Sequence, residues 1–189
     1  MKKILLIITL VFLIFQLVAL AVDIDIGMPA IHRSTSLGTG FTLVEISNPA
    51  STGGTITSVE IYVASPSSNV KVAIFYVVSG NNLSTRVFEV IGDVASGYNQ
   101  FDVNLNVLAE DFIGIYNADL ELDFEGYGVW YAIGDEIPCT DTTFTDFGEG
   151  PMSLYGTGAT VEVGWNGPFN AVAVTKWNNI EITKWNTIE

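Results

Sequence analysis

Acidic side chains recur at every second position between residues 119 and 125, which read DLELDFE. Alternate residues of a β-strand point to the same face, so these carboxylates would line one side of a strand. Calcium prefers oxygen ligands and takes about six to eight of them, so other loops would have to contribute. The sequence predicts a calcium site drawn from Asp111, Asp119, Glu121, Asp123 and Asp135. The alternative is the solvated outer face of an edge strand, where charges limit aggregation.

Three aromatic residues, Tyr127, Trp130 and Tyr131, lie close to two glycines in the segment GYGVWY, residues 126–131. Glycine beside an aromatic residue often leaves the ring exposed, and sugars stack their C–H faces on such rings. The segment is therefore a candidate carbohydrate-binding site. Packing in the core or at an interface remains the alternative, although Trp130 and Tyr131 cannot share one face of a regular strand.

The sequence lacks the motifs that are typical of enzyme active sites. His32 is the only histidine, and nothing marks it as the oriented base that a Ser-His-Asp triad needs. The sequence has no glycine-rich phosphate-binding loop and no H-E-x-x-H motif. A pair of carboxylates could serve a glycosidase, but a chain of 189 residues has little room for a deep cleft. We therefore expect a protein without enzymatic activity.

The segments that would position these candidate sites alternate apolar and polar residues and are rich in β-branched and aromatic residues. This pattern is typical of β-strands. The predicted strands cover residues 41–46, 55–64, 70–78, 86–94, 100–107, 111–116, 120–124, 129–133, 143–147 and 153–155. We expect a bulge at Thr57-Ser58, turns at 66–69 and 79–82, and a central place for 70–78, which is apolar on both faces. About ten short strands at this spacing predict an all-β fold, a sandwich or a barrel.

Three of these strands, with the sequences GTITSVEIYVA (54–64), VKVAIF (70–75) and AEDFIGIY (109–116), resemble a jelly-roll module found in bacterial extracellular proteins and phage particle proteins. Glu110-Asp111 stands where such modules usually have Gly-Asp. The resemblance covers roughly residues 24–158. It implies a jelly-roll-like antiparallel β-sandwich and, more loosely, an adhesive, carbohydrate-binding or particle-decorating role, because one fold hosts many functions.

The first 21 residues have the three parts of a secretory signal peptide. Two lysines precede a long apolar run, and Ala19-Leu20-Ala21 supplies a cleavage site. We expect cleavage after Ala21, with a retained N-terminal anchor as the alternative, since the run is nearly long enough to span a bilayer. In either case the rest of the chain would be secreted or held at the cell surface, with residues 22–160 forming the sandwich.

The charge of the chain limits its partners. The sequence holds 21 acidic and seven basic residues, a formal net charge of −14. Such a chain repels phosphate backbones and anionic lipids, so we expect no binding to nucleic acid and no membrane contact beyond the leader. Cys139 is the only cysteine, which excludes an intrachain disulfide. The expected partner is an extracellular glycan or a surface protein.

Residues 161–189 form a repeat tail in which NAVAVTKW is followed by NNIEITKW and then by NTIE. The octads resemble short K-(aromatic or aliphatic)-N-G-V repeats that link domains in phage structural and bacterial surface proteins, with Asn179 and Thr187 in place of the usual glycine. A meander with two-residue turns at 178–179 and 186–187 would suit this period, as would a stacked array or an unstructured extension. Self-association through Trp177 and Trp185 would make the protein a structural subunit, the alternative to a recognition module.

Overall fold

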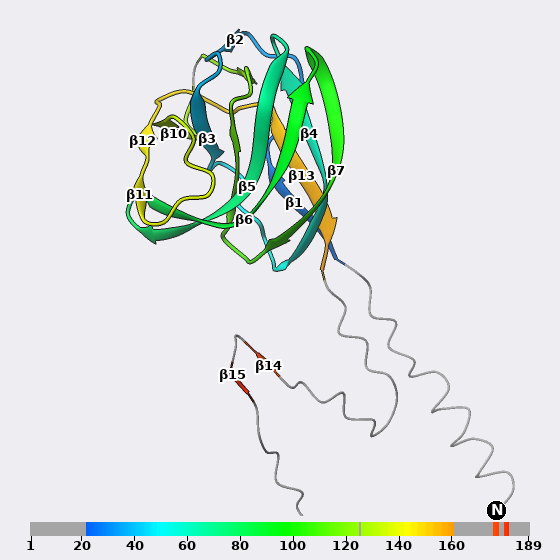
Figure 1. The fold of residues 1–189 in the computed structure, drawn as a ribbon, viewed down its shortest axis with the longest axis vertical. Helices are drawn as coiled ribbons and strands as arrows, with labels where there is room; N and C mark the ends of the chain where they lie inside the picture. Colours follow the sequence, from blue (N-terminus) through cyan, green and yellow to red (C-terminus); the bar gives the residue numbers. More distant parts are fainter. Residues whose placement is uncertain (1–21, 125, 161–175, 178–179, 182–189) are drawn as a thin grey trace, which may run out of the picture.

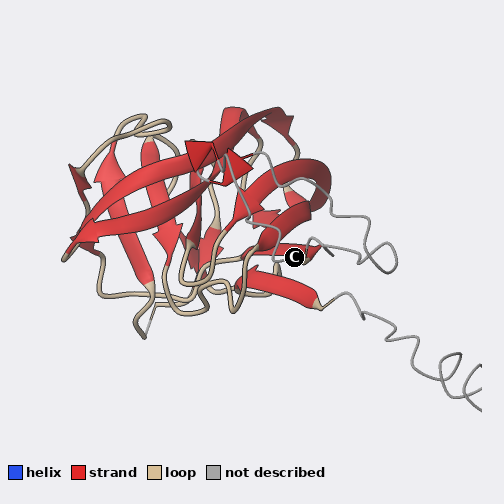
Figure 2. Ribbon diagram, turned by 90° about the horizontal axis from the view of Figure 1, so that it is seen from below, coloured by secondary structure: helices blue, strands red, loops and turns tan. Residues whose placement is uncertain are grey.

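The computed structural model describes residues 22–124, 126–160, 176–177 and 180–181. The predicted signal peptide, Trp185 and most of the tail lie outside the described residues. Within the described part, every regular element is a β-strand, and loops alone join them (Figure 2). No helix in that part is long and apolar enough to cross a membrane.

Two antiparallel sheets form the body of the protein (Figure 1). The four-stranded sheet has the order β1 (Asp23–Gly27), β13 (Leu154–Ala159), β4 (Gly54–Val63) and β7 (Gly97–Val107). The seven-stranded sheet has the order β11 (Thr142–Thr143), β6 (Asn82–Val94), β5 (Ser67–Ser79), β8 (Phe112–Tyr116), β3 (Phe41–Glu45), β10 (Val129–Ile133) and β12 (Thr145–Asp146). Two short pairs complete the set: β2 (Thr35–Ser36) with β9 (Glu121–Leu122), and β14 (Lys176–Trp177) with β15 (Ile180–Glu181).

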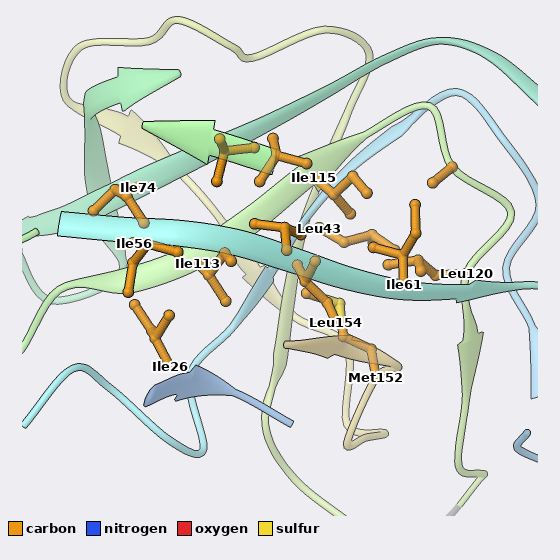
Figure 3. Packing of buried hydrophobic residues seen from close by; sticks show 14 of the residues in the cluster. Ile26, Leu43, Ile56, Ile61, Ile74, Ile113, Ile115, Leu120, Met152 and Leu154 are labelled. Atoms are coloured by element: carbon orange, nitrogen blue, oxygen red, sulfur yellow. The ribbon is translucent and has the colours of Figure 1, made fainter. Parts of the chain in front are cut away.

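The main core lies between the two sheets, as expected for a β-sandwich. Strand alternation places every second residue there: Ile56, Val59, Ile61 and Val63 of β4 are buried. Figure 3 shows buried side chains of this core, which come from both sheets and from the connections; those labelled are Ile26, Leu43, Ile56, Ile61, Ile74, Ile113, Ile115, Leu120, Met152 and Leu154. The prediction of an all-β sandwich is confirmed.

A second, smaller core covers the outer face of the seven-stranded sheet. Phe75 of β5 meets Phe144 edge-on, with 5.7 Å between ring centroids, and both side chains are fully buried. Ile137, Val44, Ala73 and Leu83 complete this cluster. Gly114 of β8 makes room for it, because a Cβ atom there would lie only 2.6 Å from the Phe75 ring. β5 is therefore apolar on both faces and central in its sheet, as predicted.

Several local predictions are confirmed and others are wrong. The β4–β7 register shifts between Ile56 and Ser58, where the bulge was expected, and residues 80–81 form the turn between β5 and β6. The expected turn at 66–69 is wrong, because β5 begins at Ser67 and is irregular up to Val70. The expected strand 143–147 is instead two short strands, β11 and β12, at opposite edges of the sheet. The jelly-roll resemblance stays a prediction.

The two ends of the sandwich leave it side by side (Figure 1). The Val22 backbone N–H donates to Thr160 Oγ1 (3.1 Å), and the Thr160 N–H donates to the Val22 carbonyl (3.0 Å). The loops that follow β1 and precede β13 lie at the other pole, where Met28 N–H donates to the Leu154 carbonyl. The distal pole therefore lies at the opposite end of the sandwich from Val22 and Thr160.

Candidate functional site

The predicted calcium ligands are distributed among separate contacts. Asp111 accepts hydrogen bonds from Arg86 Nε (2.5 Å), Arg86 Nη2 (2.8 Å) and the Leu108 N–H (2.8 Å). Asp135 Oδ2 pairs with Lys71 Nζ at 2.5 Å. In the described residues, no group of three or more metal-ligating side chains comes together. The geometry therefore adds no support to the calcium prediction.

Two carboxylates of the acidic run at 119–123 are turned inward. Asp119 and Glu121 are 8% and 7% exposed, and their neighbours Leu120 and Leu122 are fully buried, whereas the Asp123 side chain is 41% exposed. The expectation of a solvated outer face is therefore wrong for Asp119 and Glu121. Only Glu121–Leu122 forms a strand, so the two-residue alternation of a long strand does not apply.

Arg33 explains why these acids point inward. Its Nη1 pairs with Asp123 Oδ2 at 2.5 Å, its backbone N–H donates to Glu121 Oε2 at 2.6 Å, and its Nε donates to Ser153 Oγ at 3.0 Å. Asp119 Oδ1 accepts the Gly38 N–H at 2.9 Å. The three carboxylates thus hold the loops of the distal pole together, and Asp119 and Glu121 do so from buried positions.

Glu45 completes this loop network from inside the core. Its side chain is fully buried, and its two carboxylate oxygens accept the backbone N–H groups of Ser47 and Met152, each at 2.9 Å. Burial raises the pKa of Glu45 above its ordinary value of 4.5, and these hydrogen bonds oppose the rise. The loops after β3 and before β13 are therefore joined by a carboxyl group that resists ionisation.

The raised pKa of Glu45 predicts a pH dependence of stability. The native state keeps the proton at pH values where the unfolded chain has already lost it, so the stability linked to this group falls as pH rises through the folded-state pKa. We expect the free energy of unfolding of the wild type, relative to Glu45→Gln, to fall as pH is raised from about 4 to 7. Urea unfolding across this range checks it. A difference that stays constant or grows with pH would contradict the prediction.

The predicted aromatic platform is divided by the structure. Tyr127 is 82% exposed in the loop before β10. Trp130 lies opposite Val44 and packs on the second core. Tyr131 packs on the main core, edge-on to Phe41 and Phe147. Trp130 and Tyr131 therefore lie on opposite faces of β10, as strand geometry requires, and the three rings do not form one surface.

A different aromatic surface lies on the outer face of the four-stranded sheet. We call it the tyrosine face and define it by Tyr62 and Glu60 of β4, Tyr98 and Gln100 of β7, Tyr155 of β13 and Asp25 of β1. Tyr62 is paired with Tyr98, and Glu60 lies between Tyr155 on one side and Gln100 on the other. Directly opposite residues in an antiparallel pair have Cβ atoms about 5 Å apart. Three phenol rings therefore gather around one carboxylate.

These side chains point outward because their strand neighbours point inward. Ile61 and Val63, on either side of Tyr62, are buried in the main core. Tyr98 is 52% exposed, while Tyr62 and Tyr155 are half-buried. Alternate residues of the same strands thus point to opposite sides of the sheet, one set into the main core and the other onto the tyrosine face.

Polar groups surround the three rings. Tyr155 Oη lies 3.4 Å from Asp25 Oδ2, and Gln100 Nε2 donates to Ser58 Oγ at 2.8 Å. His32 extends the surface at the distal pole, with its ring 5.6 Å from that of Tyr62 and its Nδ1 2.7 Å from Glu121 Oε2.

The electrostatics keep the phenols neutral. Partial burial and then the nearby Asp25 and Glu60 carboxylates raise the pKa of Tyr155 above its ordinary value of 10.0. Local desolvation, followed by the charge of Glu60 and a hydrogen bond to it, raises the pKa of Tyr98. Both tyrosines therefore keep their hydroxyl protons, which interact with the Glu60 and Asp25 carboxylates.

A shallow hollow of about 590 Å³ adjoins the tyrosine face between β1 and β13. Asp25, Tyr155, Thr57 and Thr157 are among the residues that line it. Aromatic rings beside carboxylate, amide and hydroxyl groups can hold a sugar, because the rings take its C–H face and the polar groups take its hydroxyls. This arrangement does not require a catalytic group.

Sequence reasoning did not identify the tyrosine face, although its residues lie in predicted strands. The outward alternation of Glu60 with Tyr62, and of Tyr98 with Gln100, is visible in the sequence. The pairing of β4 with both β7 and β13 is not, because these strands are distant along the chain. The gathering of the three tyrosines depends on that pairing.

Comparison of the chain with protein-family models, curated proteins and solved structures found no match in any of the three.

Proposed function

We propose that this protein is an exported, non-catalytic recognition module that binds carbohydrate through its tyrosine face. The observation that carries the proposal is the gathering of Tyr62, Tyr98 and Tyr155 around Glu60 on an open sheet surface. Aromatic rings provide large contact areas at low conformational cost, and they dominate the energetics of many recognition surfaces.

The position of the site supports the same role. Tyr155 lies four residues before Ala159 along β13, which is about 13 Å of strand. Tyr62 and Tyr98 lie near the same distal end of the sheet, since Val63 pairs with Gly97 while Gly54 pairs with Val107. A module attached through its leader or its tail would therefore present the tyrosine face away from the attachment.

A glycan-array screen of the chain from residue 22 onward tests the proposal. We expect binding to a defined set of glycans, and the screen is repeated with a calcium chelator. Loss of binding in the chelator would make calcium part of the site. An array without binding in either condition would contradict carbohydrate recognition.

The second candidate function is assembly of a particle or surface layer through the tail. In the described residues of the tail, β14 pairs with β15, with Trp177 opposite Ile180, so residues 178–179 separate two paired strands. Strands of this kind could continue in a second copy of the chain. Trp185, the other residue predicted to act in assembly, lies outside the described residues.

Deletion of residues 161–189 separates the two functions. For a recognition module we expect glycan affinity to stay within about twofold, because the tyrosine face belongs to the sandwich. For a structural subunit, the intact chain should be oligomeric and the deletion should abolish assembly. Titration with the glycan and the mass in solution measure the two outcomes, and Trp177→Ala with Trp185→Ala is the milder variant of the deletion.

A further inference from the structure

We infer that the tyrosine face selects glycans whose sugars carry protonated amino groups. The inference rests on the proposed function and narrows its ligand class. The distribution of charge in the sandwich and the position of Glu60 support this selectivity.

The four-stranded sheet contains acidic residues and no basic ones. Its strands read DIDIG, LYGTGA, GTITSVEIYV and GYNQFDVNLNV, without a lysine or arginine. Between residues 22 and 160 the sequence has three basic residues, Arg33, Lys71 and Arg86. Each is paired with an aspartate elsewhere in the fold, at Asp123, Asp135 and Asp111 respectively. The strands of the tyrosine face therefore offer an anionic ligand no lysine or arginine, and His32 beside Tyr62 is the nearest side chain that can become cationic.

Glu60 lies where a cationic ligand group would be held best. It is opposite Tyr155, two residues from Tyr62 on the same face, and raises the pKa of Tyr98 by its charge. An ammonium group near it would gain an ion pair and the attraction of the phenol faces, the combination that aromatic cages use for cations. Asp25 and Asp102 extend the negative charge across the same face.

This geometry favours an amino sugar over a glycan bearing uronic acid or sulfate groups. Like charges on the ligand would meet Glu60 and Asp25 without compensation, which costs binding energy. The surface also extends over three adjacent strands, β13, β4 and β7, which gives room for successive sugar rings. A lysine-rich peptide shares the amine but not these flat rings, so it serves as a competitor in the test.

The test compares two hexasaccharides with the same backbone, one of β-1,4-linked glucosamine and one of N-acetylglucosamine. Calorimetric titration of the chain from residue 22 onward is run at pH about 5.5, where glutamate is largely ionised and the sugar amines are protonated. We expect the amino form to bind about tenfold more tightly, with a preference that weakens as salt is added. Equal binding, or tighter binding of the acetylated form, would overturn the inference and leave carbohydrate recognition intact. No binding of either hexamer, where the array has found other glycan ligands, would also overturn the inference alone.

A matched pair of variants assigns the selectivity to the site. Glu60→Gln is expected to reduce the preference to about twofold or less while leaving the acetylated hexamer almost unaffected. Glu110→Gln removes the same charge beyond the far end of β7, about 30 Å of strand from Tyr98, and should keep the preference. If both variants lost the preference for the amino hexamer equally, or if a lysine hexamer bound as tightly, the preference would be an effect of net charge alone. Either result would overturn the inference.

Discussion

Replacing Tyr62 and Tyr98 together with alanine is expected to weaken binding of the best glycan found on the array by about a hundredfold or more. The two rings are opposite each other on β4 and β7, so their removal erases the centre of the tyrosine face. Truncating a central aromatic contact typically costs about 2 kcal/mol or more. Neither side chain is fully buried, so the fold should persist. Calorimetric titration measures the affinity, and thermal unfolding verifies the fold.

Tyr127→Ala is the control for this result. Tyr127 is the most exposed of the three aromatic residues that the sequence predicts as ligand contacts, and it lies in the loop before β10. We expect its removal to change affinity by less than about twofold, as for energetically neutral surface positions. If Tyr127→Ala abolished binding while the double variant bound normally, the site would belong to the loop and the tyrosine face would be wrong.

Replacing Phe75 with alanine is expected to lower the free energy of unfolding by about 3–5 kcal/mol, the usual cost of such a truncation in a core. The Phe75 side chain is fully buried against Phe144, and its ring packs closely over Gly114. The loss would approach the whole stability of many small domains. Urea unfolding followed by tryptophan fluorescence measures it, since Trp130 packs on the same cluster.

Val90→Ala is the matched control on the neighbouring strand. Val90 belongs to β6 and is 65% exposed, so its replacement should change stability by less than about 0.5 kcal/mol. A Phe75→Ala variant as stable as Val90→Ala would show that the second core contributes little and that the segment 134–144 merely lies over the sheet.

The local pattern of the sequence was sufficient for the long strands and their faces, but not for β1, β9, β11 and β12. Val72–Phe75 carries apolar residues at consecutive positions, which favours a place between two apolar layers, and in the structure Ile74 packs in the main core and Phe75 in the second core. The bulge in β4 was visible as a break in alternation at Thr57. These features depend on neighbours one or two residues away, so one sequence is enough to predict them.

The acidic run at 119–123 shows where prediction from neighbouring residues fails. Asp119, Glu121 and Asp123 have the spacing of an exposed strand face, but Arg33 and the Gly38 N–H, about 80 to 90 residues earlier, hold them at the distal pole. A buried carboxylate is stable when hydrogen-bond donors satisfy it, and spacing alone says nothing about those donors. The calcium prediction failed to gain support for the same reason, since each predicted ligand already has a partner.

The sequence by itself determined the long strands, the all-β class and the chemical character of the protein, an acidic chain without catalytic motifs. Only the tertiary structure decided which side chains act together. Tyr62, Tyr98 and Tyr155 come from three strands whose adjacency and register are set by pairing across the sheet. A shift of one residue in any of these pairings would turn a tyrosine into the core. Alternation predicts the face on which a residue lies, whereas its neighbours on that face depend on non-local pairing.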